Sequence, residues 1–473
     1  MIIPKTSLSK FKNQGSLLAI IFVLILVMWI NFKTTPWNKE HQVIASDVCQ
    51  YYSYLPAIFI YDDIKLTFLK KDHSLLGPNF YPSPSPIGVF GIISTYGVGL
   101  LYSPFFFAAH AYALMSDYPA NGLSVPYKFM LQWSSWFYLW MALLLMRKLL
   151  KKYFADRVVA LVIITTVIST NLLWYVTGEA AMSHLFSFFL ITAYLFLVDR
   201  WLEKPTAKNT ILLGLTAGLI SLIRPTNAII GILPILWKIT NWQELKTRFA
   251  FFLKNANLIL LMLAMALLIW LPQMYYWKII SGSWLYYSYP DNQGFFFNNP
   301  QLFNNLFSWR KGWLIYLPVM GLMLVGIGLL YKVKKQFFWP LLLYFLLAWY
   351  VLSSWWSWWY GGGFSIRPYV DSLGIFSFGL AGFLTWTFKQ RLALKIILFA
   401  VFAITFWNGA HNNARFANHS IHFDSNTKST YLDGFFHIKM QPGFYKTLEK
   451  PDYNMARKGI YRIEGKEADS SGN

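Results

Sequence analysis

The chain alternates between long apolar runs and short polar segments over most of its length. The run LLAIIFVLILVMWI (17–30) shows no alternation of apolar and polar residues, which predicts a membrane-spanning helix and not a strand of a transmembrane barrel. Runs of comparable length recur up to about residue 410. The pattern therefore predicts an all-α polytopic membrane protein.

Composition agrees with a membrane protein and argues against a nucleic-acid partner. Of the 473 residues, 56% are hydrophobic and 13% are charged, about half the charged fraction of a soluble protein. The net charge is +21, but Lys and Arg form short groups at the ends of apolar runs, where they orient helices. We therefore expect no nucleic-acid partner. The single cysteine, Cys49, excludes an internal disulfide and argues against a Cys-based metal site.

The basic groups also predict how the chain crosses the membrane. Lysines at 5, 10 and 12 orient the N-terminus inward, and the next strong basic group is RKLLKK (147–152). Residues 33–127 then form one large first loop on the outer side. Its apolar part, 88–115, contains Gly, Pro and a histidine and has no basic exit loop, so we expect interfacial or re-entrant helices there.

Continuing this alternation yields about eleven spans, with the C-terminus outside. The membrane domain is expected over 1–410 and a small extracytoplasmic tail over 411–473. The expected spans are residues 16–32, 129–146, 158–177, 184–200, 210–223, 226–240, 255–275, 312–331, 337–356, 371–388 and 392–410.

With this orientation, several charged residues lie on the outer side. The outer acids are Asp47, Asp62, Asp63, Glu179, Asp291 and Asp371, and the outer bases are Arg224, Arg310, Lys311 and Arg367. Basic residues there oppose the orientation rule, and a bound anion is one reason for them. The planar fork of arginine suits a phosphate in particular.

The outer bases occur in three stretches that we expect to converge on one cavity opposite Asp47. These stretches are LIRPTN (222–227), LFSWRKGWLIYLP (306–318) and WSWWYGGGFSIRPYV (356–370). Structural roles remain open for most of these residues. The tryptophans are typical of an interfacial belt, Arg310 and Lys311 of snorkelling side chains, and Asp62–Asp63 of a solvated turn. Arg224 and Arg367 would then pair with nearby acids.

The order of these features resembles the GT-C superfamily of membrane glycosyltransferases, nearest to bacterial relatives of the protein O-mannosyltransferases. The resemblance spans about residues 10–410 and rests on Asp47, MSHLFSFFL (182–190) and the three stretches above. It implies a helical fold whose large first loop holds a catalytic acid. It also implies a sugar donor on a polyprenyl phosphate, used on the periplasmic face of a bacterial inner membrane, with a lipid, glycan or protein acceptor.

On this hypothesis Asp47 is the general base. Arg367, Arg224, Lys311 and His184 bind the donor phosphate, in that order of preference. The expected substrate-binding residues are Tyr51, Tyr52, Asp62, Asp63, Glu179, Tyr360 and Asp371.

The chain departs from the family pattern at two positions. Val48 follows Asp47 where relatives often carry a second acid, and Thr95 stands where many have a lysine. Asp62 or Asp63 would supply the second acid, or the reaction runs without a divalent metal. No other cofactor is expected. A lipid-linked sugar flippase and a non-catalytic GT-C-like scaffold are the competing functions.

Overall fold

The computed structural model describes residues 14–70, 72–77, 80–289 and 293–461, and these residues are mostly helical. Within these ranges, the only paired strands are β1 (Ser83–Pro84) and β2 (Phe90–Gly91), which are antiparallel and belong to the first loop. The all-α class is therefore confirmed.

In the described part of the chain, eight helical segments are long and apolar enough to cross a membrane. They contain α2 (Gly15–Thr34), α5 (Gly97–Leu114), α6 (Val125–Leu150), α9 (Ser183–Glu203), α13 (Ala256–Ser281), α17 (Phe338–Ser353), α18 (Leu373–Phe388) and α19 (Leu392–Ala417). Shorter apolar helices are α10 (Ala207–Ile223), α11 (Ile232–Leu236) with the preceding 3₁₀ segment η4 (Pro225–Gly231), and α16 (Val319–Val333). These helices are those of a multi-pass membrane protein.

Three expected spans differ from the helices found. The expected helix 158–177 is divided into α7 (Asp156–Ile168) and the short α8 (Trp174–Thr177). The expected span 226–240 contains only η4, which begins at Pro225, and the five-residue α11, which ends at Leu236. The expected span 312–331 begins later, at Val319, directly after Pro318. The count of about eleven spans and their orientation stay predictions.

The first loop is more ordered than its polar sequence indicates. It contains α3 (Asp47–Tyr52), α4 (Tyr54–Phe59), the β1–β2 pair and the 3₁₀ segments η1 (Pro36–Asn38), η2 (Thr67–Lys70) and η3 (His73–Leu76). Within the apolar part 88–115, α5 is a continuous 18-residue helix that satisfies the length and hydropathy of a span. Its expected interfacial position stays a prediction.

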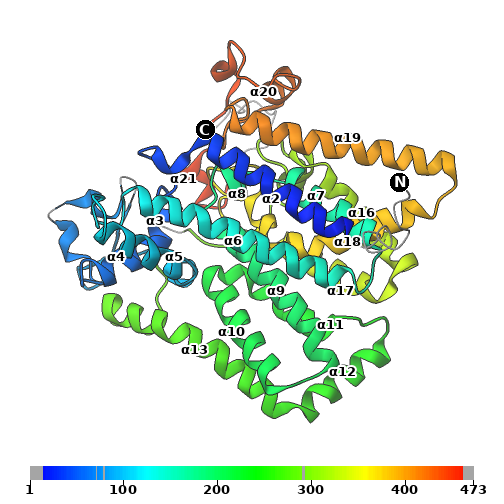
Figure 1. Ribbon diagram of the computed structural model, residues 1–473, viewed down its shortest axis with the longest axis horizontal. Helices are drawn as coiled ribbons and strands as arrows, with labels where there is room; N and C mark the ends of the chain where they lie inside the picture. Colours follow the sequence, from blue (N-terminus) through cyan, green and yellow to red (C-terminus); the bar gives the residue numbers. More distant parts are fainter. Residues whose placement is uncertain (1–13, 71, 78–79, 290–292, 462–473) are drawn as a thin grey trace, which may run out of the picture.

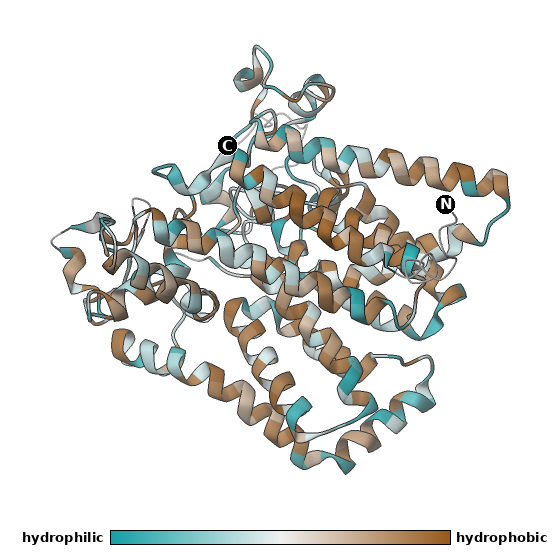
Figure 2. Cartoon of the chain, in the orientation of Figure 1, coloured by the Kyte–Doolittle hydropathy of each residue, from teal (hydrophilic) through white to brown (hydrophobic). Residues whose placement is uncertain are grey.

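Helix α18 occupies the centre of the bundle, and 89% of its apolar window is buried. Helices α13 and α19 lie at opposite edges, where only 6% of each window is buried (Figure 1). Both helices consist largely of hydrophobic residues (Figure 2), and large apolar side chains on them are exposed, among them Leu260, Leu263, Ile396 and Ile404. These exposed faces would contact lipid and not protein.

The described tail after Ala417 contains α20 (Lys428–Asp433), the 3₁₀ segment η7 (Phe444–Thr447) and α21 (Tyr453–Ala456). It folds over the segments α14 (Leu302–Phe307) and α15 (Trp313–Tyr316) and over the tryptophan-rich stretch near residue 358, as its hydrogen bonds show. The remaining helix, α12 (Trp242–Lys254), connects α11 to α13.

Candidate active site

Asp47 and Arg367 lie together although 320 residues separate them in the chain. Asp47 is the first residue of α3, and Arg367 begins the 3₁₀ segment η6 (Arg367–Ser372) that leads into α18. Arg367 Nη2 is 3.1 Å from Asp47 Oδ2. The Asp47 side chain is 46% exposed and that of Arg367 is 18% exposed, so this ion pair borders open space and leaves the carboxylate accessible.

A second set of polar and charged side chains surrounds Asp371, whose carboxylate is fully buried. Arg224 Nε is 3.5 Å from Asp371 Oδ2, and Asn227 Nδ2 donates to the same oxygen at 2.8 Å. His184 Nδ1 donates to Asp371 Oδ1 at 2.8 Å. Asp371 therefore joins the end of α10, the beginning of α9 and η6, and it holds one side of the Arg224 guanidinium in place.

The position of His184 favours a supporting role over direct phosphate contact. Its side chain is fully buried and its Nδ1 faces Asp371. Arg224, in contrast, is 19% exposed and is the C-cap residue of α10. Of the two, Arg224 is the side chain that an anion can reach.

Lys311 and Glu179 lie deeper than the Asp47–Arg367 pair. Lys311 Nζ donates to the carbonyl of Gly361 at 2.9 Å, and the residue is 2% exposed. Burial, together with the charge of Arg367, holds the pKa of Lys311 well below its usual range. Burial raises the pKa of Glu179, while the charges of Arg367 and Lys311 oppose that shift. Glu179 Oε2 is buried and has no hydrogen-bond partner among the described residues.

The expected aromatic residues have different positions. The Tyr51 hydroxyl accepts a hydrogen bond from Ser183 Oγ at 3.3 Å, and burial together with the charge of Asp47 raises its pKa. Tyr52 donates to the carbonyl of Gly122 at 2.6 Å and braces the first loop. Tyr360 donates to the carbonyl of Leu352 at 2.9 Å. Tyr51 and Tyr360 both lie within electrostatic reach of the charged site, Tyr51 of Asp47 and Arg224 and Tyr360 of Arg224, Asp371 and Arg367.

The triple glycine at 361–363 allows backbone conformations and a close approach that other residues would not. Gly361 and Gly363 have φ values of +57° and +130°, which favour glycine. A Cβ on Gly363 would meet the Tyr175 hydroxyl at 2.7 Å and Arg367 Cδ at 3.4 Å. The glycines therefore allow this segment to pass close behind Arg367.

Asp62 and Asp63 belong to a separate cavity. Asp63 closes a turn by accepting hydrogen bonds from the backbone N–H groups of Lys65, Thr67 and Phe68 at 3.0, 2.7 and 3.2 Å. Both acids line a largely apolar cavity of about 550 Å³ between α4, α5 and α13. The structure therefore does not bring the doublet to the Asp47–Arg367 pair.

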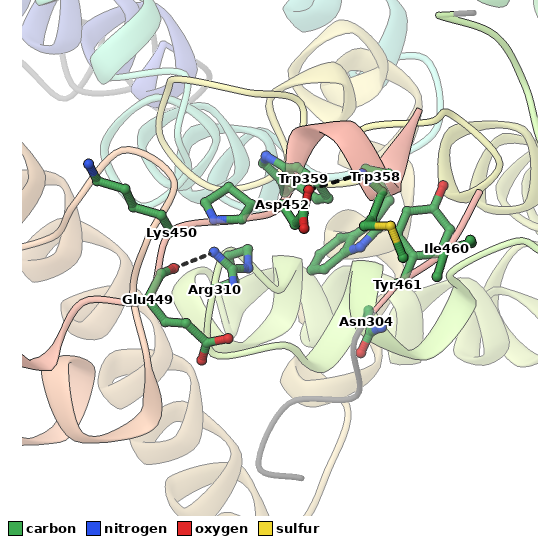
Figure 3. A pocket seen from close by; sticks show the side chains of 12 residues that line it. Asn304, Arg310, Trp358, Trp359, Glu449, Lys450, Asp452, Ile460 and Tyr461 are labelled. Carbon is green, nitrogen blue, oxygen red and sulfur yellow. Dashed lines mark hydrogen bonds between the residues drawn. The ribbon is translucent and has the colours of Figure 1, made fainter. Parts of the chain in front are cut away.

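Arg310 points away from its neighbour Lys311 and into the tail. Its Nη1 donates to the carbonyls of Asp424 at 2.9 Å and Glu449 at 2.8 Å. Figure 3 shows Arg310 in a small pocket with Trp358 and Trp359, covered by residues 449–461. Arg310 thus anchors the tail, a role that neither snorkelling nor anion binding describes.

Two site residues were missed from the sequence. Asn227 lies in the quoted LIRPTN stretch, but a lone amide carries no charge that would have singled it out. Tyr289, from the loop after α13, lies within electrostatic reach of Asp47, Arg224 and Arg367. Its position is decided by the path of that loop, and nothing in SWLYYSYP indicates it.

The acids of this site do not form a metal-binding set. Among the described residues, no group of three or more His, Cys, Asp or Glu side chains has the arrangement to hold a metal ion. Asp371 already accepts from Asn227 and His184, and Asp47 pairs with Arg367.

No protein-family model matches the chain, and no curated protein sequence matches it. One similar solved structure is the archaeal oligosaccharyltransferase AglB from Archaeoglobus fulgidus, in complex with an inhibitory peptide and a dolichol-phosphate. The TM-score is 0.51 at 12% sequence identity, over 91% of this chain. The chain spans 60% of the AglB chain. The likeness shows that the chain shares the fold of this oligosaccharyltransferase over most of its length. The resemblance to the GT-C superfamily, and the narrower one to O-mannosyltransferases, stay predictions.

Proposed function

We propose that the chain is a membrane glycosyltransferase that moves a sugar from a polyprenyl-phosphate donor to an acceptor hydroxyl. The observation that carries the proposal is the partly exposed Asp47 carboxylate, 3.1 Å from Arg367. Arg224 lies within electrostatic reach of the same tyrosines, Tyr51 and Tyr289. We infer that the proposed base and the two proposed phosphate-binding cations border one space. With the orientation that the basic loops predict, that space faces the periplasm of a bacterial inner membrane.

In the proposed reaction Asp47 accepts the proton of the acceptor hydroxyl. The acceptor oxygen forms a bond to the anomeric carbon, and the bond from that carbon to the phosphate oxygen breaks. The transition state has oxocarbenium character at the anomeric carbon, and polyprenyl phosphate is the leaving group. A positioned base contributes about 10²–10⁴-fold. The resemblance to the GT-C superfamily implies inversion at the anomeric carbon.

Arg367 has two partners in this scheme. It pairs with Asp47 in the structure, and an arriving phosphate would compete for its Nη2. That competition would free Asp47 to act as a base once the donor is bound. Arg224 supplies the second cation and is held in place by Asp371. Preorganised cations of this kind stabilise the negative charge that develops on the leaving phosphate.

We assign to Glu179 the role of the second acid, since Val48 stands where that acid is expected. Its charge interacts with Asp47, Arg367 and Lys311, whereas Asp63 is committed to its turn. Burial raises the pKa of Glu179, so its carboxyl competes less with an arriving phosphate for the positive charge of Arg367. Glu179 would thus adjust the charge of the site without contacting the sugar.

The cavity between α4, α5 and α13 suits the isoprenoid chain of the donor. Its walls include Ile58, Phe59 and Phe107. Gly99 lines it and also lies against the backbone of Tyr51, since a Cβ there would meet the Tyr51 carbonyl oxygen at 2.8 Å. A lipid in this cavity would therefore lie next to the proposed sugar site.

Substitutions at Asp47 and Arg367 test the assignment with purified protein and a polyprenyl-phosphate sugar. We expect Asp47→Asn to lower transfer by about 10²-fold or more while donor binding persists. We expect Arg367→Ala to weaken donor binding and Arg367→Lys to restore it in part, because lysine lacks the planar fork. Asp117→Asn, at an exposed acid of the first loop, is the control.

Full transfer by Asp47→Asn would reject Asp47 as the base. Wild-type donor binding by both Arg367 variants would reject the phosphate assignment. Donor turnover by the purified wild type also separates an enzyme from a flippase and from a non-catalytic scaffold, neither of which consumes the donor.

A further inference from the structure

Helix α12 (Trp242–Lys254) is an amphipathic helix with no buried residue, and it contains none of the candidate active-site residues. Three large apolar side chains on it point away from the protein: Trp242 is 67% exposed, Phe249 is 50% exposed and Leu253 is 79% exposed. Their spacing of seven and four residues places them on one stripe of the helix. Such a stripe on a short surface helix needs a partner.

The opposite side of α12 packs against the rest of the protein, so the stripe faces outward. Arg248 donates from Nη1 to the carbonyl of Pro234 and from Nη2 to the carbonyl of Trp237. Phe251 and Phe252 contact the ring of Trp201, with centroids at 5.4 and 6.3 Å. The helix is thus held against α9 and α11 on one side, and the exposed stripe faces outward.

The position of α12 in the chain indicates what lies on the outer side. Only Asn255 separates it from α13, the helix with 6% of its apolar window buried. In Figure 1 the two helices meet at the lower edge of the molecule. Because α13 presents its sides to lipid, a helix that joins its first turn lies at the membrane surface.

The charges on α12 indicate the kind of lipid. Lys246 and Lys254 are exposed. Lys246, four residues after Trp242 and seven before Leu253, lies on the stripe itself, so its long side chain would extend from the stripe to the headgroups. The helix contains one acid, Glu244, which accepts from the Thr240 N–H at 2.7 Å and from Asn241 Nδ2 at 3.0 Å. That acid is committed to the helix start, so the free charge of the helix is positive.

We propose that α12 lies in the plane of the membrane surface, with the stripe Trp242–Phe249–Leu253 among the acyl chains and Lys246 and Lys254 against anionic lipid headgroups. The proposal is independent of the glycosyltransferase assignment. A helix of 13 residues spans about 20 Å, enough to hold the α11–α13 connection along the headgroup layer.

A site-specific fluorophore tests the immersion. Cys49 is buried, so a cysteine introduced by Phe249→Cys takes a bimane label selectively in full-length protein in lipid nanodiscs. Thr247→Cys, exposed and about 200° around the helix, is the matched control. With a quencher attached to the acyl chain, we expect quenching at 249 at least twice that at 247. Leu253→Cys, on the same stripe, repeats the measurement should the Phe249 variant not fold.

Lipid composition tests the headgroup preference. We expect quenching at 249 to be greater in phosphatidylglycerol discs than in phosphatidylcholine discs, and the double variant Lys246→Gln, Lys254→Gln to remove that increase. Equal quenching at 247 and at the stripe positions would overturn the in-plane placement. Equal quenching in both lipids would overturn the role of anionic headgroups.

Discussion

At the residue scale, the candidate site depends on how buried carboxylates are satisfied. Asp371 is fully buried and accepts from His184 and Asn227 while it faces Arg224. Glu179 has one buried oxygen without a hydrogen-bond partner among the described residues. At Asp371, hydrogen-bond donors offset the cost of burying a carboxylate, whereas at Glu179 burial raises the pKa of the carboxyl.

This difference predicts a pH dependence of stability at Glu179. Burial raises its pKa above the ordinary value of 4.5, so the folded state holds this proton more tightly than the unfolded state does. Its contribution to stability is fully present below pH 4.5 and is lost as the pH rises through the raised pKa. We expect Glu179→Gln to remove that loss, so its melting temperature in detergent falls less than that of the wild type between pH 4.5 and neutrality.

Asp63 supplies a control of opposite sign. Hydrogen bonds from Thr67 and its neighbours lower its pKa, so its contribution is present above the ordinary pKa and is lost as the pH falls. Asp63→Asn should therefore be less stable than the wild type near neutrality, and this difference should shrink as the pH falls. A Glu179→Gln curve parallel to that of the wild type would contradict the assigned shift.

At the scale of elements, glycines determine how closely the helices approach. A Cβ on Gly326 of α16 would lie 1.8 Å from the carbonyl oxygen of Gly379 on α18. On α10, Gly214 and Gly218 are four residues apart, and a Cβ on either would meet the α13 backbone at 2.4 or 2.6 Å. Small residues at this spacing allow membrane helices to pack backbone to backbone. The site inherits this geometry because α10 ends at Arg224 and η6 leads from Arg367 into α18.

The α16–α18 contact predicts a strong position dependence within one helix. Gly326→Ala should destabilise the protein by about 1–3 kcal/mol through overpacking. Gly328→Ala, two residues along α16 with nothing within 4 Å of its Cβ position, should have the stability of the wild type or slightly more. Thermal unfolding in one detergent measures both, and equal effects would contradict the close approach.

At the scale of the whole molecule, the tail and the tryptophan-rich stretch form one connected cap. The Tyr453 hydroxyl donates to Asp424 Oδ2 at 2.7 Å and accepts from Trp359 Nε1 at 3.5 Å. Arg310 adds hydrogen bonds to two tail carbonyls. Gly361, which receives the Lys311 hydrogen bond, lies two residues beyond Trp359. The tail therefore supports the backbone behind Arg367.

Removing one hydroxyl tests this support. Tyr453→Phe keeps the ring but deletes both hydrogen bonds, and we expect a loss of about 1 kcal/mol with faster proteolysis of the tail. Tyr445→Phe, at a tyrosine that is 69% exposed, is the matched control. Identical melting temperatures and cleavage rates for the two variants would contradict a bracing role for Tyr453.

The sequence by itself determined the class of this protein and the approximate location of its chemistry. Apolar runs of this length predict membrane helices, because backbone polar groups inside lipid must be hydrogen-bonded within their own segment. The basic loops between the runs predict how the helices are oriented. Charges out of keeping with that pattern, such as Asp47, Arg224 and Arg367, stand out for the same reason. The spans 158–177 and 226–240 were wrong as continuous α-helices: α7 ends at Ile168 and α8 begins at Trp174, and residues 225–231 form the 3₁₀ segment η4 before the short α11.

Only the tertiary structure decided which charges meet. Asp47 pairs with Arg367 across 320 residues, and Arg310 and Lys311, adjacent in sequence, point to different places. Composition distinguishes neither case, because pairing depends on how closely helices pack and on the paths of loops between them. Hydropathy predicts whether a single segment contacts lipid, but a site is formed by several segments together. How those segments come together depends on backbone contacts between helices, many of them at glycines.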